Sequence, residues 1–277
     1  MNPTTPVFIL GSGRSGTFQM IKLLEAINNI EAHHEYLFEN ILKTSVLYRM
    51  GMADKKDVKS LLNSTHAAAL HYSNAIYWVD SSNALPWIVE PLHELFPHAR
   101  FIHLLRDGRK VVSSFYNKFV KVIYDDHSVD IVKAWLADPA RKVEPPAEKK
   151  YWRPFPIKDE RFVAEFSAFD RFQRLCYYWQ DCNLWIKDAL NHVPVNQKIT
   201  LHLEDVVSKP DVLEQFLAVF EVTYDERFMD LLKRPVNVHI PKNFPFTATQ
   251  YAQFNAIAGN AMQVFGYDTR EEYQVEY

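Results

Sequence analysis

Residues 7–17, which read VFILGSGRSGT, constrain the fold of this chain more than any other stretch. Four apolar residues run directly into three closely spaced glycines, and a segment with helical apolar periodicity follows at 18–27. The pattern predicts a buried strand, a tight turn and a helix whose free N–H groups and positive dipole end face an anion. A unit of this kind is typical of an α/β fold with a phosphate-binding loop.

The rest of the 277-residue chain continues the alternation of short apolar runs and amphipathic stretches. Further strands are expected at 76–79, 101–105 and 199–203. Helices are expected at 36–50, 55–75, 84–96, 110–122, 162–190 and 249–265, with a turn and a helix at 204–220. This order predicts a single α/β domain over residues 1–277, with a central, mostly parallel sheet flanked by helices.

One segment, 124–161, breaks the alternation. It holds five prolines between residues 139 and 156 and no sustained apolar period. A loop of this length in a compact domain is usually functional or disordered. We therefore expect an irregular lid or substrate-binding excursion here.

Composition limits the possible partners. A formal charge of −3 and a hydrophobic share of 48% are ordinary for a globular protein and argue against general binding to nucleic acid or a membrane surface. No run reaches the roughly 18–20 apolar residues that span a bilayer. No basic region precedes the first apolar run, so no signal peptide is expected and the sequence favours a cytoplasmic location.

Nothing in the sequence predicts a metal site or a disulfide. Cys176 and Cys182 lie six residues apart on an expected helix, so their side chains point in different directions. They match no zinc spacing, and the run His33, His34, Glu35 does not form HExxH.

The glycine loop also fits a dinucleotide-binding fingerprint, GxGxxG. That reading requires a second strand that ends at an acidic residue about 20 residues further on. Residues 28–40 contain acids at Glu31 and Glu35 but no β-branched run of strand length. An NAD(P)-binding oxidoreductase is therefore kept as an alternative only.

A nucleotide-triphosphate loop fits no better. It requires a lysine directly after the last glycine and a magnesium-binding hydroxyl after the lysine. Gly16 is instead followed by Thr17 and Phe18, and the cation of the loop is Arg14. A kinase remains an alternative, but the loop favours transfer of an anionic group without Mg²⁺.

A second motif, FIHLLRDGRKVVSSFY, lies at 101–116. Arg106 directly follows an expected buried strand, at the end where doubly wound sheets bind ligands. Ser114 follows eight residues later, about two turns along the expected helix. An arginine and a hydroxyl so placed can bind a second phosphate.

With both motifs in this order, the chain resembles the sulfotransferases that use 3′-phosphoadenosine-5′-phosphosulfate (PAPS). GSGRSGT is similar to their 5′-phosphosulfate loop, in the arginine-bearing form of the tyrosylprotein and carbohydrate branches. LLRDGRKVVSS is similar to their 3′-phosphate motif, and LHLEDVVSKPDVLEQFLAVF and VFGY resemble later landmarks. The resemblance implies a P-loop-like core, PAPS as co-substrate, no metal, and a hydroxyl acceptor. A catalytically inactive PAPS-binding module is a further alternative.

The resemblance also implies roles for individual residues. Arg106 and Ser114 are expected to bind the 3′-phosphate, and Glu35 stands at the offset of the general base of the tyrosylprotein enzymes. His34 is the second candidate, because the small-molecule branch uses histidine. The expected ligands of the 5′-phosphate are Arg14, the N–H groups of Ser15, Gly16, Thr17 and Phe18, and the Thr17 hydroxyl.

One departure from the family concerns the leaving group. The tyrosylprotein enzymes have a lysine after the second strand, where this chain reads VDSSNALP. Ser81 or Ser82 offers a hydrogen bond without charge. A substitute cation is expected from Lys242, from residues 141–161, or from Arg14 alone. The acceptor, whether glycan, tyrosyl, lipid or small molecule, and the oligomeric state are left open.

Overall fold

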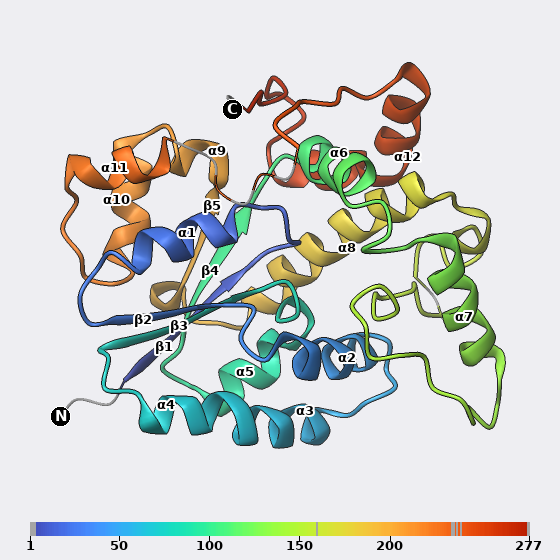
Figure 1. Cartoon of the computed structure of the whole chain (residues 1–277), viewed down its shortest axis with the longest axis horizontal. Helices are drawn as coiled ribbons and strands as arrows, with labels where there is room; N and C mark the ends of the chain where they lie inside the picture. Colours follow the sequence, from blue (N-terminus) through green and yellow to red (C-terminus); the bar gives the residue numbers. More distant parts are fainter. Residues whose placement is uncertain (1–3, 159, 234–235, 237, 239, 276–277) are drawn as a thin grey trace.

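A central parallel sheet organises the computed structural model, which describes residues 4–158, 160–233, 236, 238 and 240–275 (Figure 1). Its five strands lie in the order β2-β3-β1-β4-β5, and all four neighbouring pairs are parallel. They are β2 (Ile30–His34), β3 (Tyr77–Ser82), β1 (Thr5–Leu10), β4 (Arg100–Leu105) and β5 (Lys198–His202). The predicted α/β class with a parallel, helix-flanked sheet is confirmed.

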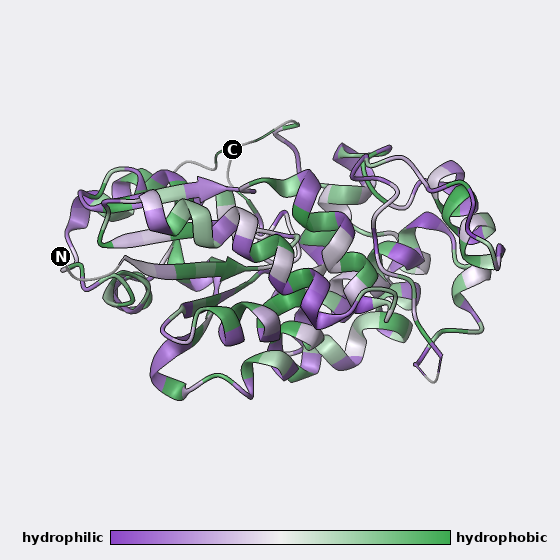
Figure 2. Ribbon diagram, turned by 90° about the horizontal axis from the view of Figure 1, so that it is seen from below, coloured by the Kyte–Doolittle hydropathy of each residue, from purple (hydrophilic) through white to green (hydrophobic). Residues whose placement is uncertain are grey.

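Helices cover both faces of this sheet. They are α1 (Thr17–Leu24), α2 (Phe38–Arg49), α3 (Lys55–Leu62), α4 (Ala68–Tyr72), α5 (Val89–Leu95), α6 (Gly108–Lys118), α7 (Asp126–Ala137), α8 (Arg171–Leu190), α9 (Leu203–Val206), α10 (Pro210–Ala218), α11 (Glu226–Leu232) and α12 (Ala248–Val264). Hydrophilic and hydrophobic residues alternate along many of them, as expected for helices with one buried face (Figure 2).

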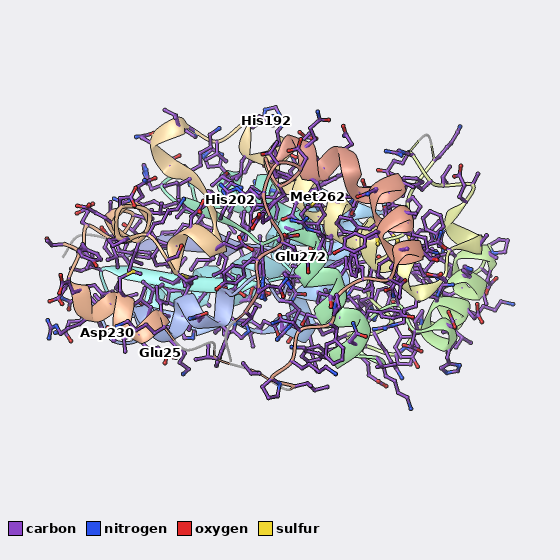
Figure 3. All side chains as sticks on the ribbon, turned by 90° about the horizontal axis from the view of Figure 1, so that it is seen from above. Glu25, His192, His202, Asp230, Met262 and Glu272 are labelled. Atoms are coloured by element: carbon purple, nitrogen blue, oxygen red, sulfur yellow. The ribbon has the colours of Figure 1, made fainter. Side chains whose placement is uncertain are left out.

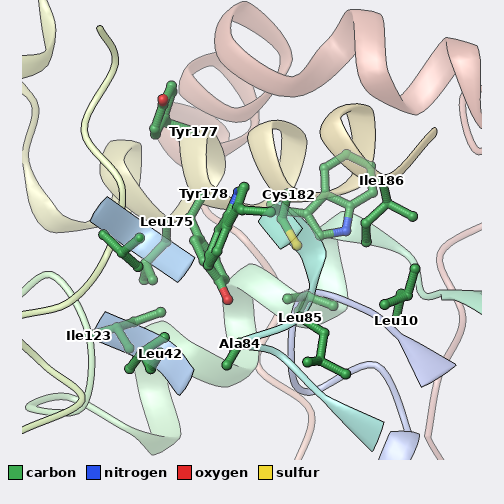
Figure 4. Packing of buried hydrophobic residues seen from close by; sticks show 14 of the residues in the cluster. Leu10, Leu42, Ala84, Leu85, Ile123, Leu175, Tyr177, Tyr178, Cys182 and Ile186 are labelled. Carbon is green, nitrogen blue, oxygen red and sulfur yellow. The ribbon is translucent and has the colours of Figure 1, made fainter. Parts of the chain in front are cut away.

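The side chains of β1 alternate between two hydrophobic clusters. Val7 and Ile9 belong to the cluster formed with α1 and α10, whereas Phe8 and Leu10 belong to the cluster formed with α2, α5 and α8. Tyr178 of α8 projects toward the same core region as Leu10 (Figure 4). A strand buried on both faces reads as a continuous apolar run, which explains why this strand was predictable.

The strand β2 corrects the prediction that residues 28–40 contain no strand. Its residues, IEAHH, have no strong strand preference, and all five are only partly buried at the edge of the sheet. Pairing with β3 therefore overrides local propensity. The strand order still disfavours a dinucleotide fold, because β3 rather than β2 lies beside β1.

The excursion at 124–161 is not irregular throughout. The helix α7 begins after Asp125, whose side chain accepts a hydrogen bond from the Ser128 N–H at 3.1 Å. Val129, Val132 and Trp135 are buried and spaced by three, a helical signal that the prolines after this helix obscured. From 138 to 165, the described residues form neither helix nor strand.

Two other predicted helices are shorter or interrupted. The helix expected from 162 begins at Arg171, because Asp170 and Gln173 form a capping box there. The helix expected at 55–75 is split into α3 and α4 by a π-helical turn at Asn63–Ala67.

A buried ion pair ties the end of the excursion to the core. Arg49 Nη2 of α2 donates to Asp181 Oδ1 of α8 at 2.5 Å and to Glu160 Oε2 at 3.1 Å. The side chains of Arg49 and Asp181 are only 3% and 8% exposed. Burial raises the pKa of Asp181, and the neighbouring guanidinium opposes this shift.

We predict that Arg49→Met destabilises the protein by about 3–5 kcal/mol, because it leaves the Asp181 carboxylate buried without its main partner. The double variant Arg49→Met/Asp181→Leu should recover much of this loss, since a buried ion pair can be replaced by apolar residues at little cost. Urea unfolding measures both. A double variant as unstable as Arg49→Met alone would contradict the explanation.

Candidate active site

The motifs of the sequence meet at one cavity of about 550 Å³. The cavity lies at the carboxyl ends of the strands, as expected for a parallel sheet. Its lining includes Gly13, Arg14, Gly16, Thr17, Phe18, His34, Glu35, Asn83, Arg106, Ser114, Lys149 and Lys242. Residues far apart in the chain therefore share one site.

The glycines of the loop are required by its backbone. Gly13 and Gly16 have φ angles of +74° and +84°, and Gly16 is the N-cap of α1. A Cβ atom on Gly16 would lie 2.5 Å from Leu203 Cδ1. This geometry turns the chain from β1 into α1, whose first residues, Thr17 and Phe18, line the cavity.

The two phosphate motifs contact each other directly. Arg14 Nε donates to Ser114 Oγ at 3.2 Å, and Arg106 Nη1 donates to the Arg14 carbonyl at 2.7 Å. The Arg14 guanidinium lies 4.5 Å from the centre of the Phe119 ring. Arg106 Nε is buried and has no hydrogen-bond partner among the described residues.

Ser15 is the one predicted loop residue that does not line the cavity. Its side chain is buried behind the loop, and a Cβ atom on Gly11 would lie 2.5 Å from its Oγ. The serine is thus packed against the glycine turn.

Glu35 lies in the turn after β2, with its side chain in the cavity. The residue has a φ of +57°, and its N–H donates to the Ser81 carbonyl at 2.9 Å. Its Oε1 accepts from Asn83 Nδ2 at 2.5 Å and from Lys149 Nζ at 3.2 Å. A non-glycine residue in the left-handed region is uncommon and often marks a functional position.

A buried network holds the next residue of this turn. The Tyr36 N–H donates to Asp80 Oδ1 at 3.1 Å, and His66 Nε2 lies 3.1 Å from Asp80 Oδ2. Both side chains of the His66–Asp80 pair are fully buried. Strand β3 therefore fixes the backbone that follows Glu35.

His34 lines the cavity beside Glu35 but has other surroundings. Its ring packs edge-on against Phe18, with 5.0 Å between ring centres, and burial lowers the pKa of the imidazole. His33 turns away from the cavity lining and contacts Glu31 at 2.9 Å.

Two residues were not singled out from the sequence. Lys149 lies within residues 141–161, where seven basic side chains gave no basis for choosing one. Desolvation, together with repulsion from Arg153, lowers its pKa to about 8, and Glu35 acts in the opposite direction.

Asn83 lies in the segment VDSSNALP, where Ser81 or Ser82 was the predicted hydrogen-bond donor. Both serines are buried and do not line the cavity, whereas Asn83 does.

The C-terminal tail closes another side of the cavity. Glu272, labelled in Figure 3, pairs with Lys110 of α6 at 2.8 Å. The same carboxylate accepts from the Tyr251 hydroxyl of α12 at 2.7 Å. These contacts bring Tyr273, Gln274 and Val275 into the cavity lining.

The described residues offer neither a metal-binding cluster nor a membrane-spanning helix. They contain no group of three or more His, Cys, Asp or Glu side chains that could hold a metal ion. Among the same residues, no helix combines the length and the apolar character needed to cross a membrane.

Solved structures of sulfotransferases are similar to this one over most of the chain. Sulfotransferase STF9 from Mycobacterium avium has a TM-score of 0.52 at 13% identity, with 99% of this chain and 79% of that chain covered. The sulfotransferase domain of the Synechococcus PCC 7002 olefin synthase has a TM-score of 0.49 at 15% identity, with 98% of each chain covered. Mouse sulfotransferase SULT7A1, solved in complex with PAP, has a TM-score of 0.44 at 12% identity, with 94% and 85% covered.

At these identities the STF9 similarity supports the fold alone, and no curated protein sequence gives a match. The decisive comparison is with a family model described as the sulfotransferase family, which matches residues 6–163. This range is more than half of the chain and contains the glycine loop, Glu35, Arg106 and Ser114. The chain therefore belongs to the sulfotransferase family.

Proposed function

We propose that this protein is an O-sulfotransferase that uses PAPS. The observation that carries the proposal is the contact between the two phosphate motifs, Arg14 with Ser114 and Arg106 with the Arg14 carbonyl, beside Glu35 in one cavity. The reaction breaks the S–O bond to the 5′-phosphate of PAPS and forms an S–O bond to an acceptor hydroxyl. Its products are 3′-phosphoadenosine-5′-phosphate (PAP) and a sulfate ester.

Arg14 and the beginning of α1 stabilise the leaving 5′-phosphate. Negative charge grows on this phosphate as the S–O bond breaks, and preorganised donors lower the energy of that charge. The first N–H groups of a helix have no intrahelical partners, so those of Thr17 and Phe18 are suited to the phosphate together with the Thr17 hydroxyl.

Glu35 removes the acceptor proton. Its Oε1 accepts two hydrogen bonds, from Asn83 and Lys149, and its Oε2 is the oxygen left for the acceptor. His34 is the weaker candidate, because burial lowers its pKa and its ring packs against Phe18.

Lys149 supplies the cation that the tyrosylprotein enzymes have after their second strand. It enters the site from the excursion, where one substitute was expected, and it lies 3.2 Å from Glu35 Oε1. An ammonium group there compensates the charge of the base and of the transferring group. Lys242 also lines the cavity and is the second candidate.

The acceptor is a hydroxyl compound whose class stays open between glycan, tyrosyl, lipid and small molecule. Because Lys149 comes from residues 124–161, we assign this excursion a part in acceptor binding within a single domain of residues 1–277.

A thermal-shift screen tests the ligand. We expect PAP to raise Tm without metal, and to raise it more than adenosine 5′-phosphate does. NAD⁺ and Mg·ATP should have no effect on Tm.

The variant Arg106→Ala tests the 3′-phosphate assignment. It should weaken PAP binding by about 10- to 100-fold, because a charge-assisted hydrogen bond is lost, and leave the binding of adenosine 5′-phosphate nearly unchanged. Stabilisation by NAD⁺ alone would favour the oxidoreductase alternative, and PAP binding without turnover would favour the inactive module.

Replacement of the base tests the chemistry. Glu35→Gln should reduce kcat by about 10²-fold or more, because the amide cannot take up the proton of the acceptor hydroxyl. PAP binding should stay within a few-fold of wild type. The matched control is Glu31→Gln, since Glu31 contacts His33 and Ser73 away from the cavity lining. Turnover of Glu35→Gln close to wild type would exclude Glu35 as the base.

The role of Lys149 predicts a pH dependence. Its pKa is about 8, so the ammonium is charged below pH 8 and neutral above it, and kcat should fall as pH rises through this value. Lys149→Arg should remove this fall of kcat at high pH, the basic limb of the pH profile, because a guanidinium stays charged. Lys149→Met should lower kcat at every pH, whereas Lys150→Met, next in sequence but outside the cavity lining, should not. An unchanged basic limb in Lys149→Arg would contradict the assignment.

A further inference from the structure

Asn83 connects the proposed base to a buried arginine. Its Nδ2 donates to Glu35 Oε1 at 2.5 Å, and its Oδ1 accepts from Arg153 Nη1 at 3.2 Å. An asparagine amide has one accepting and one donating end, and rotation by 180° exchanges them. Which end faces Glu35 therefore depends on what faces the other end.

Arg153 settles this choice chemically. A guanidinium has donors only, so the amide oxygen of Asn83 must face Arg153 and the NH₂ group must face Glu35. We propose that Arg153 is a positioning residue that fixes the amide of Asn83, so that Glu35 keeps one oxygen hydrogen-bonded and the other available to the acceptor. This inference rests on the proposed role of Glu35 as the base.

The burial of Arg153 supports a specific role. The residue is 1% exposed, and its guanidinium lies 5.4 Å from the centre of the Tyr178 ring. Within the described part of the chain, Nη1 is the one nitrogen of this guanidinium with a hydrogen-bond partner, since Nε and Nη2 have none. Burial of a charged group is costly unless hydrogen bonds compensate it, so the bond to Asn83 is the contact that constrains this guanidinium.

The position of Asn83 extends the effect to the phosphate loop. A Cβ atom on Gly13 would lie 3.3 Å from Asn83 Nδ2, so the amide packs against this glycine. One side chain therefore contacts the loop that holds the leaving group and the carboxylate that takes the proton.

The excursion carries both cations of this arrangement. Lys149 and Arg153 lie four residues apart, and one contacts Glu35 directly while the other acts through Asn83. Residues 149–153 thus contribute both to the lining of the cavity and to the hydrogen bonds that position Glu35.

The other charged groups around Glu35 set the expected pH effect. His34, Lys149, Arg14 and Asp80 belong to the same electrostatic cluster. Without Arg153, the Asn83 amide is free to turn its oxygen toward Glu35, which favours the protonated carboxyl. The fall of kcat at low pH, the acid limb of the pH profile, should then begin at a higher pH.

The test is a double-mutant cycle on Arg153 and Asn83, read from the pH profile of kcat. Arg153→Met should lower kcat about tenfold at neutral pH and raise the acid limb by about one pH unit. Asn83→Leu should do the same, and in the Asn83→Leu background Arg153→Met should add little. Equal effects of Arg153→Met in both backgrounds would overturn the proposal, because Arg153 would then act by charge or folding alone.

Controls separate this inference from the proposed function. Arg161→Met, also in the excursion but bonded to the Ala256 carbonyl, should leave the profile unchanged. PAP-induced stabilisation should persist in each variant. If Arg153→Met does not fold, Arg153→Gln repeats the comparison, since its amide can both donate and accept. If Glu35→Gln is inactive while Arg153→Met keeps the wild-type pH profile of kcat, only this inference is overturned. If Glu35→Gln turns over normally, the assignment of Glu35 as the base is overturned.

Discussion

The contact between the ends of β1 and β4 is the constraint on which the site depends. These strands are neighbours in the sheet, so the loop after β1 and the turn before α6 emerge side by side. Arg106 reaches the carbonyl of Arg14, and Arg14 reaches Ser114. Because a guanidinium and a helix N-terminus both attract anions, this contact brings together the two motifs that we propose to bind the 5′- and 3′-phosphates of one ligand.

The part of the site around Glu35, the proposed base, is built differently. It depends on β3, which lies between β1 and the edge strand β2 and has buried polar residues at its carboxyl end. Asp80 holds the backbone after Glu35, and Asn83 holds its carboxylate. The polar end of β3 thus supports the turn of the proposed base from two sides, while the cations Lys149 and Arg153 come from the excursion.

The prediction from sequence succeeded for elements that a local sequence pattern specifies. It failed for elements that depend on strand pairing or on packing against distant segments. The run at Val7 to Leu10 and its glycines imposed the first strand and turn, because burial on both faces and positive φ angles leave few alternatives. The strand β2 was missed because its stability comes from β3, and the helix α7 was missed because it directly precedes a proline-rich stretch. Arg106 and Ser114, which both line the cavity, could be proposed from the sequence because their spacing on a strand end and a helix is itself local.

By itself, the sequence determined the class of fold and the family, and it predicted the two motifs that we propose to bind phosphates. The fold class follows from the alternation of short apolar runs and amphipathic stretches, and the family was recognised from the resemblance of short motifs; neither needs knowledge of distant contacts. Only the tertiary structure singled out Lys149 among the basic residues of the excursion and linked Arg153 to Glu35 through Asn83. The physical reason is that these groups lie 48 to 118 positions from Glu35 in sequence, so only the packing of the excursion against β3 could decide which charges surround the base.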